Sequence, residues 1–182
     1  MRMPAAVMFT TSLLTACFIL AVGEARVVSA QTPAADDGVR LRRIDAGSRT
    51  APASAVVVER GSLVHTAMLY PLDRDGRVQG GNDVRAQATA VLDQFETALR
   101  AAGTGLDRVA RLHVYVADAA AGAAVDEMIA RRFAASSRPA LTRVESRMRH
   151  DGVLVAMDAI AATARHPASG RPERLRVDGL PS

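Results

Sequence analysis

The side chains that most often carry catalysis or bind metals are scattered along this chain. Its four histidines, His65, His113, His150 and His166, show neither His-x-His nor His-Glu-x-x-His spacing, which argues against a metal site. No serine lies in a Gly-x-Ser-x-Gly motif, so a serine hydrolase has no support. All 23 basic residues are arginine, which excludes Schiff-base chemistry because that chemistry needs a lysine amine. We therefore expect neither a metal nor a cofactor.

The charged residues best suited to bind a small molecule lie on two consecutive strand-like segments. Residues 138–148 alternate strictly, which predicts a strand with Arg143 and Glu145 on one face. Residues 152–161 are apolar on both faces except at Asp158, which suits a central strand, and a charge there needs a partner. One hypothesis is that Arg143 binds an anion while Asp158 or Glu145 fixes its orientation. The alternative is an ion pair between Arg143 and Asp158 that only satisfies two charges.

The rest of the domain must position these strands. Valine-rich segments alternate on either side of Arg60-Gly61, which predicts a hairpin with a tight turn. Asn82 or Asp83 can cap a helix that ends at Gly103, and Asp118 can cap a second helix that stops before Pro139. Strands are expected at residues 55–59, 61–68, 109–116, 138–148 and 152–161.

This order, β-β-α-β-α-β-β, predicts an α+β fold. Two helices cannot cover both faces of a sheet of this size, so we place them on one face of a mixed sheet. The valine- and alanine-rich strands make solvent a poor cover for the other face. A homo-oligomer that closes its sheets into a barrel solves this problem.

The first 30 residues have the features of an export signal. Arg2 precedes an almost wholly apolar run, and Val28-Ser29-Ala30 ends in the small residues that a signal peptidase accepts. Two other interpretations remain: Leu14-Thr15-Ala16-Cys17 has the form of a lipobox that would acylate Cys17, and the run is close to the length of an uncleaved anchor. All three place the folded part outside the cytoplasm, in the periplasm or secreted. Cys17 is the only cysteine, so no disulfide is expected.

The segments that flank the domain are polar. We predict a linker over residues 31–53, with one short strand near 39–44, and a disordered basic tail over residues 163–182. The net charge of +4 is spread along the chain rather than gathered on one face, so we expect no nucleic-acid partner. Contact with a membrane is expected only through an uncleaved or lipidated N-terminus.

Between residues 55 and 162 the chain resembles the RidA/YjgF family. The resemblance implies a chorismate-mutase-like fold over residues 54–162 that assembles as a homotrimer, with a small-molecule pocket at each subunit interface. Each landmark is short, and their order and spacing together carry the resemblance. The landmarks are Gly61-x-Leu63-Val64, Pro71-Leu72-Asp73, Asp83-x-x-x-Gln87, Leu99-x-x-Ala102-Gly103, Val114-Tyr115-Val116-x-Asp118, Pro139-Ala140 and Asp158-Ala159-Ile160-Ala161.

The chain departs from the family where the family does its chemistry. The resemblance implies an arginine that holds a substrate carboxylate and a glutamate that positions the attacking water, and these positions are Leu141 and Ala156 here. A lost charge-assisted contact to a carboxylate is worth about 1.5–3 kcal/mol. The family's activity, that of a 2-iminobutanoate/2-iminopropanoate deaminase, is therefore expected to be absent or very slow.

Hydrocarbon also replaces small polar residues near the end of the second strand. There the family's Ser-Gly-Gln becomes Ala67-Met68-Leu69, followed by Tyr70. Met68 and Leu69 can be simple interface packing, or they can adapt the cleft to an uncharged, more hydrophobic ligand. Arg143 lies about 6.5 Å along the strand from Leu141 and on the same side.

These observations favour an exported protein that binds a small metabolite at clefts between subunits. The residues predicted to line this cleft are Arg143, Asp158, Met68, Tyr70 and Leu141. Two alternatives remain: a weak or divergent enamine or imine hydrolase that uses Arg143, and a purely structural trimer. The sequence leaves open whether the chain is an enzyme.

Overall fold

The structure, a computed structural model, describes residues 38–45, 51–178 and 180. These residues all belong to one compact unit, Ala34–Ser182. The predicted export signal with Cys17, and most of the predicted linker, lie outside the described residues. The elements in chain order are β1 (Arg40–Ile44), β2 (Ala55–Arg60), β3 (Ser62–His65), α1 (Val84–Ala101), a 3-10 turn at Leu106–Arg108, β4 (Val109–Val116), α2 (Ala119–Arg132), a 3-10 turn at Ala135–Ser137, β5 (Ala140–Glu145) and β6 (Val155–Thr163).

Both helices begin at the predicted aspartate caps. Asp83 accepts hydrogen bonds from the backbone N–H groups of Arg85 and Ala86, and Asp118 accepts one from Ala121. The apolar residues of α1 recur at intervals of three and four, so one face of the helix is buried. Neither helix is long and apolar enough to cross a membrane, and no other helix in the described ranges is.

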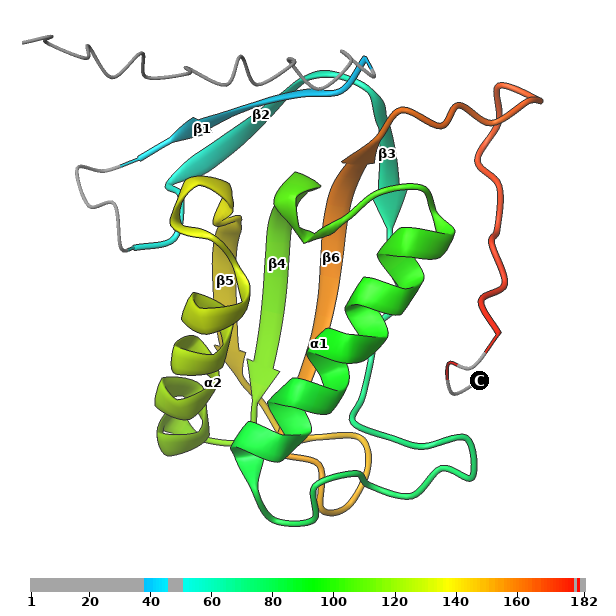
Figure 1. Cartoon of the computed structure of the whole chain (residues 1–182). Helices are drawn as coiled ribbons and strands as arrows, with labels where there is room; N and C mark the ends of the chain where they lie inside the picture. Colours follow the sequence, from blue (N-terminus) through cyan, green and yellow to red (C-terminus); the bar gives the residue numbers. More distant parts are fainter. Residues whose placement is uncertain (1–37, 46–50, 179, 181–182) are drawn as a thin grey trace, which may run out of the picture. The chain divides into compact units, whose positions relative to one another are not determined.

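Four strands form a mixed sheet in the order β3-β6-β4-β5. β4 pairs in parallel with β5, whereas β6 pairs antiparallel with both β4 and β3. The central position predicted for residues 152–161 is confirmed by β6. Both helices cover the same face of this sheet, as predicted (Figure 1).

The predicted hairpin around Arg60-Gly61 is wrong, although both of its strands exist. β2 pairs with β1, and β3 pairs with β6, so the chain passes from one sheet to another at this point. Gly61 has φ of 119°, and a Cβ there would lie 3.1 Å from the backbone oxygen of Thr163. Glycine therefore bends the chain between sheets instead of closing a turn. The short strand predicted near residues 39–44 is confirmed as β1.

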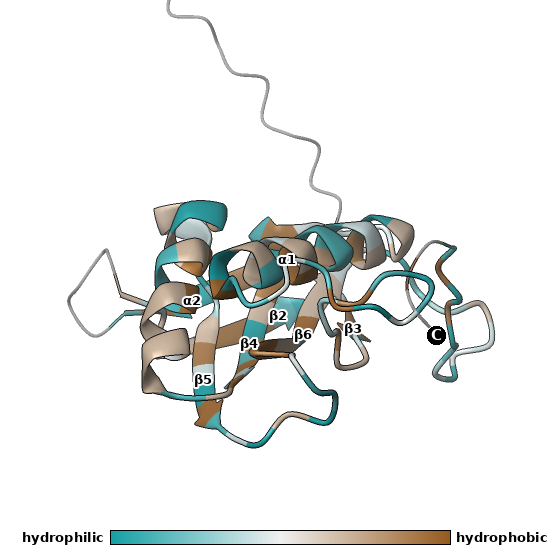
Figure 2. Ribbon diagram, turned by 90° about the horizontal axis from the view of Figure 1, so that it is seen from below, coloured by the Kyte–Doolittle hydropathy of each residue, from teal (hydrophilic) through white to brown (hydrophobic). Residues whose placement is uncertain are grey.

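The two faces of the four-stranded sheet differ in their cover. On the helix-covered face, Leu112, Val114 and Met157 are almost completely buried. On the other face, Leu63 is 53% exposed and Val144 is 41% exposed. Figure 2 shows both helices on one side of the sheet and none on the other. Within one chain this second face lacks the cover that the sequence analysis anticipated, and the trimer that would supply it stays a prediction.

Candidate functional site

The residues predicted to line one cleft lie at opposite edges of the sheet. Leu141 and Arg143 belong to β5, which is one edge strand. Met68 and Tyr70 follow β3, which is the other edge strand, and β6 and β4 lie between them. A single chain therefore does not bring Leu141 together with Met68. A cleft that combines these residues requires two copies of the chain.

Leu141 lines a pocket between helix α2 and strand β5, called here the α2–β5 pocket. Its volume is about 350 Å³. Leu141 also packs against the hydrophobic core, so it forms an apolar floor. The lining residues come from the segment before β2, from α2 and from the start of β5: Pro52, Asp126, Glu127, Ile129, Ala130, Arg138, Pro139 and Leu141.

Arg143, the predicted anion-binding residue, is held by helix α2. Its Nη1 donates to a carboxylate oxygen of Asp126, which also lines the pocket. Its aliphatic part lies on Gly122, where an added Cβ would be 3.1 Å from Arg143 Cδ. Because glycine has no side chain, the aliphatic part of Arg143 packs directly against helix α2 at Gly122. The carboxylate of Asp126 neutralises the charge of Arg143.

The predicted pairing of Arg143 with Asp158 is wrong. Strand register places Arg143 beside Val114 on the helix-covered face, whereas Asp158 lies beside His113 on the other face. Asp158 has a partner, as a charge in a buried strand requires: its Oδ1 lies 2.7 Å from Nδ1 of His113. Glu145 shares the face of Arg143, but Asp126 is the residue that pairs with it. The structure therefore leaves Asp158 unable to orient Arg143 within one chain.

The second carboxylate of the α2–β5 pocket is also paired. Glu127 accepts a hydrogen bond of 2.9 Å from Arg85 on helix α1. This hydrogen bond, followed by the positive charge of the same guanidinium, holds the pKa of Glu127 below its ordinary value. Glu127 is consequently ionised and bound to arginine at neutral pH.

Arg138 is one of the pocket residues that the sequence analysis missed. Among the described residues no carboxylate lies within ion-pair distance of its guanidinium, and its Nε is buried without a hydrogen-bond partner. Its position just before Pro139 was the only sequence signal, and that signal concerns backbone shape rather than binding. Asp126 was missed as well, because helical periodicity does not show which strand residue a polar helix residue meets.

The other predicted cleft residues have surroundings of their own. Tyr70 makes an edge-to-face contact with His150, with ring centroids 4.8 Å apart. Met68 is 37% exposed, while its neighbour Leu69 is buried and bridges to Met157 of β6. Ala156, in the family's glutamate position, is completely buried. Met68 and Tyr70 thus offer an apolar surface at the β3 edge.

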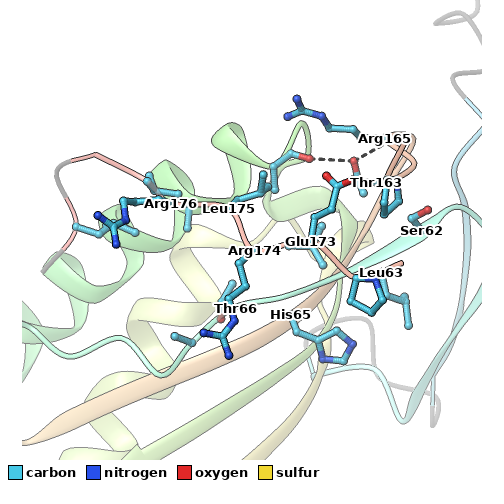
Figure 3. A pocket seen from close by; sticks show the side chains of 18 of the residues that line it. Ser62, Leu63, His65, Thr66, Thr163, Arg165, Glu173, Arg174, Leu175 and Arg176 are labelled. Carbon is cyan, nitrogen blue, oxygen red and sulfur yellow. Dashed lines mark hydrogen bonds between the residues drawn. The ribbon is translucent and has the colours of Figure 1, made fainter. Parts of the chain in front are cut away.

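A larger pocket, of about 940 Å³, lies at the β3 edge and is called here the β3–tail pocket. It is bordered by β3, the C-terminal end of α1 and the chain after β6. Figure 3 shows Arg174 from that chain, with His65 from β3 and Thr66 directly after it. His166 lies 2.6 Å from the hydroxyl of Ser62, which ties the start of this segment to β3. Residues 165–178 form no helix or strand.

The described part of the chain shows no group of three or more His, Cys, Asp or Glu that could hold a metal ion. The His113–Asp158 pair on the uncovered sheet face belongs to no such group. The chemistry available in the α2–β5 pocket is therefore that of arginine, carboxylate and hydrocarbon.

Residues 44–163 match the family model described as Endoribonuclease L-PSP. Over 106 residues the chain is 34% identical to the RutC family protein PH0854 of Pyrococcus horikoshii. The aligned region covers 57% of this chain and 82% of that protein.

Solved structures show the same fold. The Rid family protein YyfB of Yersinia pestis, a protein of unknown function, superposes with a TM-score of 0.60 and 25% identity over 67% of this chain and 98% of that chain. The yeast protein YEO7 superposes with a TM-score of 0.52 and 25% identity over 68% of this chain and 99% of that chain.

Proposed function

The chain belongs to the RidA/YjgF family, and from this premise we propose that it binds a small molecule at clefts between the subunits of a homotrimer, rather than acting as an efficient imine deaminase. The fold and the family are the background to this proposal. Its content rests on the residues that occupy the α2–β5 pocket.

The observation that carries the proposal is the environment of Leu141. The family resemblance implies a guanidinium at this position, and the chain has a leucine that forms the floor of an apolar pocket of about 350 Å³. Arg143, the nearest replacement on the same strand face, is bound to Asp126. A substrate carboxylate would therefore find no bidentate partner on this face of β5, where the family's reaction requires one.

The second support comes from Ala156. The family resemblance implies a glutamate there that positions water, whereas a buried methyl group can neither orient water nor transfer a proton. Asp158, two residues further along β6, is engaged with His113. Neither group expected of a hydrolase of this kind is present in the position where the family uses it.

The trimer is supported by where the cleft residues lie. Leu141 at one sheet edge and Met68 at the other can share a cleft only if copies associate head to tail, which is the arrangement that forms closed rings. Light scattering on the purified domain tests this part. A mass of three subunits is expected, and a monomer would remove the shared cleft.

The export signal adds a proposed location outside the cytoplasm. Cell fractionation with an antibody against the domain, compared with a variant that lacks residues 1–30, tests it. Recovery of the full-length protein in the cytoplasm would contradict export.

The experiment that tests the function has two arms. Freshly generated 2-aminoacrylate is incubated with the protein and pyruvate is followed, and binding of small apolar molecules is measured by calorimetry on the same preparation. We expect no acceleration of pyruvate formation, and binding that Leu141→Asp weakens. Acceleration that disappears in Arg143→Gln would instead favour the weak hydrolase, and absence of both activity and binding would favour a structural trimer.

A further inference from the structure

Three charged side chains line the α2–β5 pocket, and two of them are paired. Asp126 is paired with Arg143, and Glu127 is paired with Arg85. Both acids of the lining are therefore matched by arginines, one on β5 and one on α1. The charge that remains to face the pocket is the positive charge of Arg138.

The guanidinium of Arg138 makes poor contacts for a group of its polarity. Its Nε is buried without a partner, and the one hydrogen bond of its side chain among the described residues runs from Nη2 to the backbone oxygen of Ala130, at 3.5 Å. Buried polar groups are nearly always hydrogen-bonded, and an unsatisfied donor on a charged group is costly. An arginine in this state gains more than usual from an incoming anion.

The backbone around Arg138 is held by hydrogen bonds from two neighbouring segments. Its carbonyl oxygen accepts a hydrogen bond of 3.1 Å from Nε of Arg43, and the oxygen of Pro139 accepts one of 3.2 Å from the N–H of Ala53. The residue is thus anchored beside the pocket that its side chain lines. Such anchoring lowers the entropic cost of holding a ligand.

The remaining lining is hydrocarbon. Pro52, Ile129, Ala130 and Leu141 surround the space next to this guanidinium. A ligand that fits both parts has an apolar body and one negative group. A carboxylate matches the planar fork of arginine.

We propose that Arg138 is the anion-binding residue of the α2–β5 pocket and that the ligand class is a small monocarboxylate with an apolar body. This inference rests on the proposed function and deepens it, because it replaces the expectation of an uncharged ligand with that of a singly charged one. The guanidinium enters from the segment before β5, three residues ahead of Leu141, and leaves the strand position itself apolar.

Two probes of the same shape test the proposal, isocaproate and its neutral amide, isocaproamide. Calorimetry measures their binding to the wild-type protein and to the variants Arg138→Gln, Arg138→Lys and Arg131→Gln. Arg131 is the matched control, because it is an exposed arginine on the last turn of α2 that does not line the pocket. We expect Arg138→Gln to weaken isocaproate binding at least about tenfold and to leave isocaproamide unchanged. Arg138→Lys should retain part of the preference for the acid, and Arg131→Gln all of it.

The outcomes separate this inference from the proposed function. Equal binding of both probes, unaffected by Arg138→Gln, would overturn the assignment of Arg138 and leave a small-molecule pocket in place. Binding of isocaproate weaker than about 10 mM would also overturn the ligand class, and a negative result with neutral apolar probes would then overturn the proposed function too. Thermal unfolding of each variant serves as the folding control. A structural role for Arg138 would lower the unfolding temperature of Arg138→Gln, whereas removal of a buried unsatisfied donor should not.

Discussion

The two faces of the four-stranded sheet are made by the same strands but have different chemistry. The face under α1 and α2 presents side chains such as Leu112, Val114 and Met157, which are almost completely buried. The opposite face presents His113, paired with Asp158, among side chains that remain partly exposed. A single chain buries the first face under its own helices and leaves the second face without cover.

This contrast shows where stability and function are separated in the molecule. Apolar burial, the main favourable term in folding, is concentrated under the helices, so changes there act on the fold of the single chain. The uncovered face, where Leu63 and Val144 are exposed, remains available to another molecule. The following predictions test that separation.

The largest effect is expected from truncating a leucine under the helices. Leu99 is completely buried in the core, and Leu99→Ala should lower the free energy of unfolding by about 2–5 kcal/mol at every protein concentration. Leu63, exposed on the other face, is the matched control. Leu63→Ala should destabilise the protein only to the extent that a second copy covers it, so its effect should grow with protein concentration. Denaturant unfolding at two concentrations checks both, and a concentration-independent loss at Leu63 would contradict the contrast.

The next effect concerns a buried amide on helix α1. Gln87 is completely buried, donates from Nε2 to the oxygens of Gly81 and Gly152, and accepts at Oε1 from the N–H of Leu154 at 2.7 Å. Gln87→Leu leaves these backbone groups unsatisfied, so a loss of about 1–3 kcal/mol is expected in denaturant unfolding.

Gln94 is the control for this prediction. It is also buried, but it makes one hydrogen bond, from Nε2 to the oxygen of Leu72, and its Oε1 has no partner. Gln94→Leu should therefore cost less than Gln87→Leu. An equal cost would show that volume, rather than the hydrogen bonds, determines the effect.

The covered face is also the part that the sequence predicts well. Asp83 and Asp118 cap the two helices by accepting hydrogen bonds from N–H groups two or three residues further along. Because this interaction is local in sequence, it can be predicted without knowledge of the fold. The alternation in β4 and the apolar run in β6 likewise identify strands before their neighbours are known. The hairpin was mispredicted because a glycine such as Gly61 serves a turn and a bend between sheets equally well.

The site is predicted less well, for a physical reason. Alternation within β5 shows that Arg143 and Leu141 share a face, but the register with β4 decides whether Asp158 is on that face, and register is a long-range property. The partner that Arg143 does have comes from a helix, where the small residue Gly122 allows the approach. Whether the guanidinium of Arg138 is paired depends on where the folded chain places the carboxylates around it. The spacing of residues in the sequence does not predict those positions.

A smaller effect is expected on the uncovered face. The His113–Asp158 pair is about three-quarters buried, and its side chains are joined by a contact of 2.7 Å. A double-mutant cycle with His113→Ala and Asp158→Asn, measured by thermal unfolding at neutral pH, should give a coupling of about 1 kcal/mol. A coupling near zero would show that the pair adds nothing to the stability of this face, which would make the contrast between the two faces sharper still.

The smallest effect concerns the exposed pair between α1 and α2, and it depends on pH. The hydrogen bond from Arg85 lowers the pKa of Glu127 in the folded state, so the pair contributes stability that is fully present above the unfolded pKa of glutamate and is lost as pH falls through the lowered folded pKa. Thermal unfolding of wild type and Glu127→Gln should therefore differ at neutral pH and converge in acid. Arg85→Gln should remove most of the same pH-dependent difference, because it removes the guanidinium that lowers the pKa of this carboxylate most, and added salt should shrink the difference. If the two variants differed in their pH profiles, a group other than Arg85 would control the ionisation of Glu127. The pairing of both pocket acids with arginines, which leaves Arg138 as the unpaired charge of the pocket, would then be contradicted.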